Sequence, residues 1–361
     1  MKRIKLFDPA IGRNEQIIMN KILKSGSWAF GSGTGLVSKF EKKFNDYVGS
    51  KACVAVNSGT AALHLALKLA NIKGKEVLLP SLSFVSTAHA IIYNGGKPVF
   101  VDVDPVTLCI DPQKILKSIS KKSTAVLPVH FGGMPCNMNE ISKICKDNEL
   151  TLVEDAAHAA GTKINNKKIG SHGKFVCFSF HPVKNLAMPN GGAITINQGK
   201  PPELSNTLKS LRWCGISNRI DTKYDVSEIG WNFYMNEFSA GIGIEQLKNL
   251  DRNNNKRKKI AKRYSDEIQI YSKMPFNNNS SYHLFWIQVK NRKNFMNKMR
   301  NNGIETGIHY LPIHKMSAYK SFSKPLPITE KVSNKIVSLP IHPNLSNDDV
   351  TRIINLVNKF N

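Results

Sequence analysis

Short apolar runs alternate with helix-like stretches through the first half of the chain. ACVAV at residues 52–56 and EVLLP at residues 76–80 are each followed by a stretch with helical character, and TLVED at residues 151–155 follows the amphipathic segment EISKICKDNEL. A strand, a helix and a second strand form the unit that builds a parallel sheet. The alternation therefore predicts an α/β fold with a mostly parallel central sheet flanked by helices.

Helical periodicity lies on both sides of this region. Before it we predict a helix over Glu15–Lys24, a Gly/Ser-rich turn and a second, amphipathic helix. The core stripe expected of that second helix is Val37, Phe40, Phe44 and Tyr47. Near the chain end, FMNKMRNNGIETGIHYLPIH predicts a helix capped at Gly303 and then a strand, and Asn347 is the expected N-cap of a closing helix.

The change in pattern after Asp251 suggests a second domain. A basic helix over Arg252–Ile268 is expected there, followed by a smaller unit that contains YHLFWIQV, a short strand. At 361 residues the chain has the length of about two domains. We predict a large domain over residues 1–250 and a smaller α+β domain over residues 251–361, with N-terminal residues able to pack against the smaller one.

Composition excludes several classes of protein. The net charge is +25, but the basic residues are spread along the chain, and the dense run KRKKIAKR (Lys256–Arg263) is expected to be a solvated helix face. We therefore expect no nucleic-acid binding; a positive surface suits a phosphate-bearing substrate. No apolar run approaches the roughly 18 residues of a membrane span. With no apolar stretch after the basic start, we expect no signal peptide, no membrane and a cytoplasmic location.

The six cysteines are scattered without a C-x-x-C pair. Several of them lie inside apolar, strand-like runs, so we expect reduced and buried thiols. Asp102 and Asp104 alternate with valines before a proline and are typical of a strand end followed by a turn. The sequence predicts neither a disulfide framework nor a metal site.

Polar and aromatic residues gather where the predicted strands end. Asn57–Thr60, Phe84, His130, Asp155 and His158 all lie at or just beyond such an end. Ligands of parallel sheets bind at this edge. The residues Ser58, Gly59 and Thr60 precede a helix, so they could cradle a phosphate with free N–H groups, although the same residues also cap helices for structural reasons. Phe84 could stack on a flat ring or belong to the core.

One carboxylate and one lysine each follow a buried strand. Asp155 ends the run TLVED, and Lys184 lies 29 residues further on (184 minus 155) in FSFHPVKN. A carboxylate can keep the ring nitrogen of pyridoxal phosphate protonated, while a lysine amine forms the Schiff base with its aldehyde. The neighbours of Lys184 are nearly all uncharged, which favours its neutral amine. The pair predicts a pyridoxal phosphate site.

Ordered motifs along nearly the whole chain resemble one family. NSGTAALHLAL, PSLSFVSTAHAI, VEDAAHAAG and FSFHPVKN are followed by EIGWNFYMNEFSAGIGIEQL, TGIHYLPIHKMSAYK and VSLPIHPNLSNDDVTRIINLV. In this order and spacing they resemble the sugar aminotransferases of the DegT/DnrJ/EryC1/StrS family. The resemblance implies the aspartate aminotransferase fold (type I), in which the large domain binds pyridoxal phosphate.

The resemblance also implies roles for individual residues. Lys184 would bond to the cofactor and later act as general acid and base, and Asp155 would pair with the ring nitrogen. The other implied cofactor contacts are His158 beside the ring, Phe84 stacked on it, Gly59, Thr60 and Ser179 at the phosphate, and Asn232 reaching the phosphate from a partner subunit. The last of these implies a homodimer with shared active sites. His309 and Tyr310 are implied substrate contacts, although a core position is the alternative for both.

The family implies a reaction as well. It is the transfer of an amino group, with L-glutamate as the usual donor, to a keto carbon of a nucleotide-linked deoxysugar, with pyridoxamine phosphate as the intermediate form of the cofactor. Two alternatives stay open. One is sugar dehydration on the same fold, but relatives that catalyse it carry histidine in place of Lys184. The other is a regulator that binds pyridoxal phosphate without catalysis.

The chain departs from the family pattern at four residues. Pro189 and Asn190 stand where the family usually has a carboxylate-bearing run, Cys214 where it commonly has histidine, and Tyr234 where it has arginine. These differences concern the substrate contacts that the resemblance implies. The residues implied to hold pyridoxal phosphate are unchanged.

Overall fold

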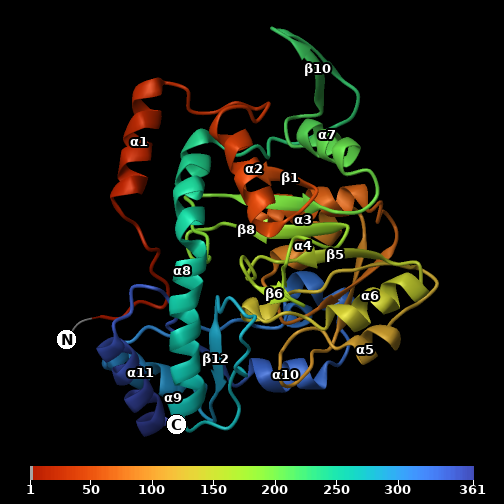
Figure 1. Ribbon diagram of the computed structural model, residues 1–361. Helices are drawn as coiled ribbons and strands as arrows, with labels where there is room; N and C mark the ends of the chain where they lie inside the picture. The colour runs from red at the N-terminus through yellow and green to blue at the C-terminus, as the bar shows by residue number, and fades with distance from the viewer. Residues whose placement is uncertain (1–2) are drawn as a thin grey trace.

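A seven-stranded sheet forms the centre of the computed structural model, which describes residues 3–361 (Figure 1). Its strands lie in the order β1-β9-β8-β5-β4-β2-β3. Their bounds are β1 Ala52–Val56, β2 Glu76–Pro80, β3 Lys97–Val101, β4 Ser123–Val126, β5 Thr151–Asp155, β8 Phe175–Ser179 and β9 Gly192–Ile196. β9 runs antiparallel to both of its neighbours, and the other pairs are parallel. The predicted mostly parallel sheet is confirmed. The first two residues of the basic start lie outside the described chain.

Alternation along the strands supplies both faces of the sheet with apolar side chains. In β8, Phe175 and Cys177 join one core cluster, whereas Val176 and Phe178 join another on the opposite face. Successive strand residues point to opposite faces, so a strand buried on both sides must be apolar throughout. The first face is covered by α3 (Gly59–Leu69), α4 (Ser86–Tyr93) and α7 (Pro201–Leu211). The second is covered by α2 (Leu36–Val48), α5 (Pro112–Leu116), α6 (Met138–Asp147) and α8 (Glu237–Glu267).

The two N-terminal helices form as predicted. α1 spans Arg13–Ser25, and in α2 the side chains of Val37, Phe40 and Phe44 are fully buried. Tyr47 is partly buried at the edge of the same cluster. The helical spacing of these apolar residues therefore identified the core face of α2.

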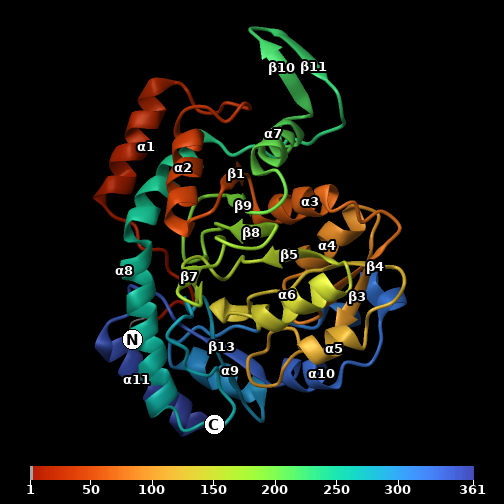
Figure 2. The ribbon, with the colours of Figure 1, turned by 45° about the vertical axis from the view of Figure 1, so that its right-hand side comes forward.

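α8 is a single helix of 31 residues that runs from beside α1 and α2 to the C-terminal part of the chain (Figures 1 and 2). It begins at Glu237, 15 residues before the predicted start at Arg252 (252 minus 237), so the expected helix was only its C-terminal half. Leu250 packs in the core beneath the large sheet, and Tyr264 packs against Phe285, with ring centroids 5.1 Å apart. The helix thus contacts both the large sheet and the C-terminal part of the chain.

The basic run in α8 is not wholly solvated. Lys256, Lys259 and Lys262 are exposed as expected, but Arg257 is only 5% exposed, and Ile260 is buried beside it. The exposed lysines therefore lie on the outer face of the helix, and the buried Arg257 and Ile260 lie on its inner face. The prediction of a solvated face was therefore wrong for Arg257.

The C-terminal part contains a small two-stranded sheet. β12 (Phe285–Gln288) pairs antiparallel with β13 (Ile336–Leu339), and the α-helices that follow α8 are α9 Arg292–Asn301, α10 Pro327–Ser333 and α11 Asn347–Phe360. The strand predicted after Gly303 was wrong, because Ile304 and Gly307 each form only an isolated bridge, to Ile4 and Ser338. The N-cap of α11 is Ser346 instead of Asn347.

Two hairpins lie outside the main layers. β6 (Lys163–Ile164) and β7 (Lys167–Lys168) are joined through Asn165 and Asn166, both with positive φ, which is typical of a tight hairpin turn. β10 (Ile216–Ile220) and β11 (Lys223–Val226) form an exposed arm that projects away from the body (Figure 2). Within residues 3–361, no helix is long and apolar enough to cross a membrane.

Candidate active site

A cavity of about 340 Å³ opens where the carboxyl ends of the central strands meet the C-terminal part. The predicted site residues that line it are Gly59, Thr60, Phe84, Asp155, His158, Ser179, Lys184, His309 and Tyr310. Asn232 is the predicted site residue that lies elsewhere, exposed on the surface. The fold thus brings together predicted site residues that are up to 251 positions apart in the chain (310 minus 59). This is the edge at which ligands of parallel sheets bind.

Asp155 ends β5 and is held by two hydrogen bonds. Its Oδ2 accepts one from the hydroxyl of Thr87 at 2.9 Å, and its Oδ1 accepts another from the backbone N–H of Ala157 at 3.0 Å. Burial raises the pKa of Asp155, while these bonds and the charge of Lys184 act in the opposite direction. The carboxyl group is therefore fixed in one orientation at the cavity wall.

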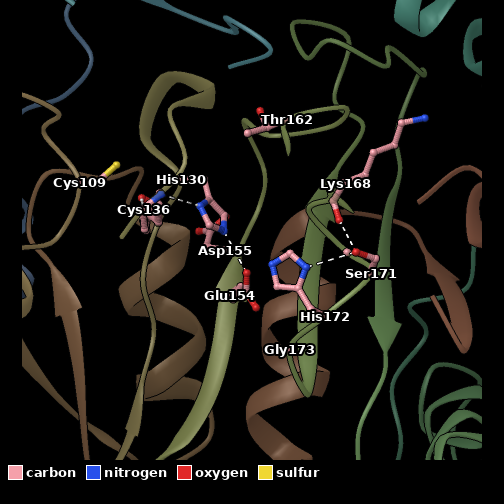
Figure 3. Close-up of polar contacts among 12 residues, drawn as sticks. Cys109, His130, Cys136, Glu154, Asp155, Thr162, Lys168, Ser171, His172 and Gly173 are labelled. Carbon is pink, nitrogen blue, oxygen red and sulfur yellow. Dashed lines mark hydrogen bonds and ion pairs between the residues drawn. The ribbon is translucent and has the colours of Figure 1, made fainter. Parts of the chain in front are cut away.

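Glu154, its neighbour in β5, bonds to a histidine outside the cavity lining. The backbone N–H of Cys136 donates to His130 Nδ1 at 3.1 Å, so the ring hydrogen is on Nε2 and donates to Glu154 Oε2 at 3.1 Å (Figure 3). Both His130 and Glu154 are completely buried. His130 was expected near the strand ends, and it lies there as a support of β5.

Lys184 follows β8, and its amine lies in the cavity. Its Nζ is 3.5 Å from His283 Nε2. Burial lowers the pKa of Lys184 to about 8, against a smaller opposite effect of the Asp155 charge. About a tenth of the amine is therefore neutral at pH 7, far more than for an ordinary lysine, and the neutral form is the one that acts as nucleophile or base.

The start of α3 forms a tight cradle against β8. Ser58 caps the helix by accepting a hydrogen bond from Ala61 N–H at 3.1 Å. For this residue the alternative of a structural helix cap therefore holds. The first N–H groups of a helix have no partner within it and attract anions. A Cβ added to Gly59 would lie 2.7 Å from the Cβ of Ser179, so only glycine lets helix and strand approach this closely.

The opposite side of the cavity is aromatic. Phe84 is 55% exposed, so the alternative of a core phenylalanine was wrong. Its ring centroid lies 6.1 Å from that of Tyr310, whose hydroxyl is 3.2 Å from His158 Nε2. His309 bonds through Nδ1 to the hydroxyl of Ser338 at 3.0 Å. His309 and Tyr310 are partly buried at the cavity surface, so neither is a pure core residue.

Sequence reasoning missed three residues of this site. His283 lies in YHLFWIQV, where the pattern indicated only a strand, and Phe7 stacks on it with centroids 5.5 Å apart. Phe7 also lines the cavity. Thr87 belongs to the quoted motif PSLSFVSTAHAI, so its place one helical turn after Phe84 could have drawn attention to it.

The family departures occupy different surroundings. Asn190 lines the cavity and is exposed at its rim, whereas Pro189 belongs to a separate apolar hollow with Ile11 and Met188. Cys214 is exposed, and Tyr234 is half-buried. Of the four, Asn190 is the residue placed to meet a ligand in this cavity.

The residues present fit pyridoxal phosphate. A lysine with a lowered pKa, a fixed carboxyl group and a helix N-terminus packed through glycine surround one cavity of suitable size. Fold and cavity together define a pyridoxal phosphate-dependent enzyme of the aspartate aminotransferase fold. The model of the DegT/DnrJ/EryC1/StrS aminotransferase family matches residues 9–358, and the chain belongs to this family.

Similar proteins match this chain over almost its full length and over almost the full length of their own chains. The dTDP-3-amino-3,6-dideoxy-alpha-D-galactopyranose transaminase of Aneurinibacillus thermoaerophilus is 37% identical, over 96% of this chain and 94% of that protein. The spore coat polysaccharide biosynthesis protein SpsC of Bacillus subtilis is 36% identical, over 97% of this chain and 95% of that protein. The structure of Helicobacter pylori PseC, an aminotransferase involved in the biosynthesis of pseudoaminic acid, matches with a TM-score of 0.93 and 26% identity over 99% of each chain.

Proposed function

We propose that this protein transfers an amino group from an amino acid, L-glutamate, to a keto carbon of a nucleotide-linked deoxysugar. The observation that carries the proposal is the meeting of Lys184 and Asp155 in one cavity of a chain from a sugar aminotransferase family. The relatives named for a dTDP-linked aminosugar and for pseudoaminic acid support this class of acceptor.

Lys184 is the acid–base residue of this proposal. Its lowered pKa raises the neutral share of the amine, which can take the Cα proton from a bound amino acid and return it later in the cycle. The neighbouring His283 has a pKa held well below its ordinary value by burial and then by the charge of Lys184. The ring that contacts the lysine is therefore neutral and adds no positive charge of its own beside the amine.

Asp155 and the α3 cradle would hold the cofactor. When bound, pyridoxal phosphate supplies an aldehyde that bonds to amines and a ring that withdraws electrons from the attached carbon. The carboxylate of Asp155 would accept a hydrogen bond from the protonated ring nitrogen, since Thr87 and Ala157 already orient it. Gly59, Thr60 and Ser179 would bind the phosphate, with Phe84 and His158 on the ring.

His309 and Tyr310 would contact the substrate. Both lie on the C-terminal side of the cavity, opposite the strand ends that carry Asp155 and Lys184. We propose residues 251–361 as the smaller domain that supplies this side. A lysine at position 184 disfavours sugar dehydration, because the relatives that catalyse that reaction carry histidine in its place.

A homodimer with shared active sites is part of the proposal. Asn232 is exposed, and its backbone oxygen accepts a hydrogen bond from the Asn57 side chain at 3.2 Å, at the entrance to α3. The β10–β11 arm nearby exposes Ile220 and Tyr224. Exposed apolar side chains on a projecting hairpin are typical of a surface that a second subunit covers.

The test is a half-reaction with defined substrates. Enzyme converted to its pyridoxamine phosphate form by L-glutamate would be mixed with a panel of nucleotide-linked keto sugars and simple keto acids. We expect the absorbance of the pyridoxal form to return with at least one sugar and the aminosugar to be detected by mass spectrometry. A panel in which only simple keto acids restore the spectrum would reject the sugar acceptor.

A further inference from the structure

The ring of His158 is held in one tautomer by the backbone. The N–H of Gly132 donates a 3.2 Å hydrogen bond to His158 Nδ1, so this nitrogen carries no hydrogen in the neutral ring. Gly132 has φ +63, and the next residue, Gly133, has φ +93. A Cβ on Gly133 would lie 2.9 Å from Tyr282 N, so the FGG turn that aims this N–H requires glycine.

The tautomer decides what the Tyr310 hydroxyl can do. The hydrogen on His158 Nε2 donates to Tyr310 Oη across 3.2 Å, which leaves the hydroxyl's own hydrogen for another acceptor. Within residues 3–361 no other hydrogen-bond partner of this hydroxyl is present. Tyr310 lines the cavity together with Lys184. The free hydrogen is therefore available to a ligand in that cavity.

The ring stays neutral in its surroundings. Burial lowers the pKa of His158 well below its ordinary value, and the charges of Lys184 and His309 lower it further. Burial and Asp155 raise the pKa of Tyr310, so its hydroxyl keeps its hydrogen. The rings of His158 and His283 have centroids 4.4 Å apart, and His283 contacts the Lys184 amine. One ring thus separates the proposed acid–base residue from the ring that orients Tyr310.

We propose that His158 is a positioning residue that fixes Tyr310 as a hydrogen-bond donor to an oxygen of the keto sugar, at or next to the carbon that receives the amine. The inference rests on the proposed function and deepens it. It assigns His158 an action on the acceptor substrate, in addition to any contact with the cofactor ring. Substrates that offer a donor or a methyl group at this point are disfavoured, because the hydroxyl then loses its acceptor.

The first test reads the tautomer without any reaction. Protein labelled with ¹⁵N in its histidine rings would be compared with the His158→Gln protein to assign the His158 signals by NMR. We expect hydrogen on Nε2 and none on Nδ1 near neutral pH. A ring with its hydrogen on Nδ1 would overturn the inference, because Nε2 could then only accept from Tyr310.

The second test separates the two half-reactions. Tyr310→Phe should slow amine transfer to the sugar about tenfold or more and affect the glutamate half-reaction less, because it removes a donor aimed at the sugar. His158→Met should cause a similar loss. The amide of His158→Gln can accept from Gly132 and donate to Tyr310, so this variant should recover most of it. Tyr271→Phe, on a fully exposed tyrosine, is the matched control.

The double variant decides between positioning and mere packing. If His158 acts through Tyr310, His158→Met should cost little more in a Tyr310→Phe background, since coupled residues are not additive. Additive losses, or a Gln variant as slow as the Met variant, would overturn the inference. Thermal unfolding would show that each variant is folded. If the unaltered enzyme aminates no sugar, the proposed function fails and the inference fails with it; active enzyme with insensitive variants rejects the inference alone.

Discussion

The amine of Lys184 lies 3.5 Å from Nε2 of His283, although 99 residues separate them in the chain. The contact joins the loop after β8 to the residues just before β12, so residues from both parts of the chain surround the amine. Burial there lowers the pKa of Lys184 to about 8. Residues from both parts of the chain therefore bury the amine and lower its pKa.

The lowered pKa of Lys184 predicts that covalent binding of the cofactor depends on pH. The neutral amine attacks the aldehyde, so the rate at which cofactor-free enzyme binds pyridoxal phosphate covalently should rise with pH through a midpoint near 8. Stopped-flow absorbance would measure it. Because the Asp155 charge raises this pKa, Asp155→Asn should move the midpoint lower. A midpoint near the ordinary lysine value of about 10.4 would contradict the geometry.

Removal of the lysine should abolish turnover. We expect Lys184→Ala to lower kcat at least about a thousandfold, since it removes both the covalent anchor and the acid–base group. Lys167→Ala, on an exposed residue of β7, should leave kcat unchanged. Borohydride treatment followed by peptide mass spectrometry should find the cofactor on Lys184 in the control only. Full transamination by the Lys184→Ala protein would refute the assignment.

The hydroxyl of Thr87 should affect kcat because it orients the carboxyl group of Asp155. Thr87→Val removes the 2.9 Å hydrogen bond to Asp155 Oδ2 and should lower kcat roughly 3- to 10-fold, in keeping with the loss of one buried bond. Thr87→Ser keeps the hydroxyl and should recover most of the rate. Equal rates for the Val and Ser variants would mean that the bond does not orient the carboxyl group during catalysis.

The cradle at α3 should tolerate no side chain. Gly59→Ala places a Cβ 2.7 Å from the Cβ of Ser179, so helix and strand must separate and the cofactor should bind about tenfold more weakly or worse. Titration of cofactor-free protein by fluorescence would measure it. Gly12→Ala meets its nearest atom at 3.5 Å and is the matched control. Unchanged affinity in Gly59→Ala would remove the cradle from the phosphate site.

Subunit mixing tests the shared site. If Asn232 serves a neighbour's cofactor, inactive Lys184→Ala and Asn232→Ala subunits should together form one intact site in each mixed dimer. Random mixing should then restore about one quarter of the activity, since half of the dimers are mixed and each has one intact site. Mixtures that form dimers yet stay inactive would mean that Asn232 acts only within its own subunit.

The residues at strand ends could be predicted because parallel strands bring their carboxyl ends to one edge. Asp155, Lys184 and Gly59 were found in this way, and all three line the cavity. His283 and Phe7 could not be found, because each meets the site only through the packing of the C-terminal part and the first residues. Whether Phe84 was exposed also depended on that packing.

The N-terminal half of α8 escaped prediction for a different physical reason. Gly241 and Gly243 lower its helix propensity, but a Cβ at Gly243 would lie 2.1 Å from Met188 Cε. Tertiary packing there outweighs local propensity, because the helix must pass close to the loop after Lys184. Sequence patterns report the local preference and miss such a contact.

Because α8 is unbroken over 31 residues, about 45 Å of helix, the two sides of the cavity are joined by a stiff rod. A flexible linker would let them swing apart, but a continuous helix permits only gentle bending. We therefore expect the cavity to keep nearly the same width through the catalytic cycle. Substrates would enter and leave by small elastic displacements and by movements of rim side chains such as Asn190, without a large closure of one part over the other.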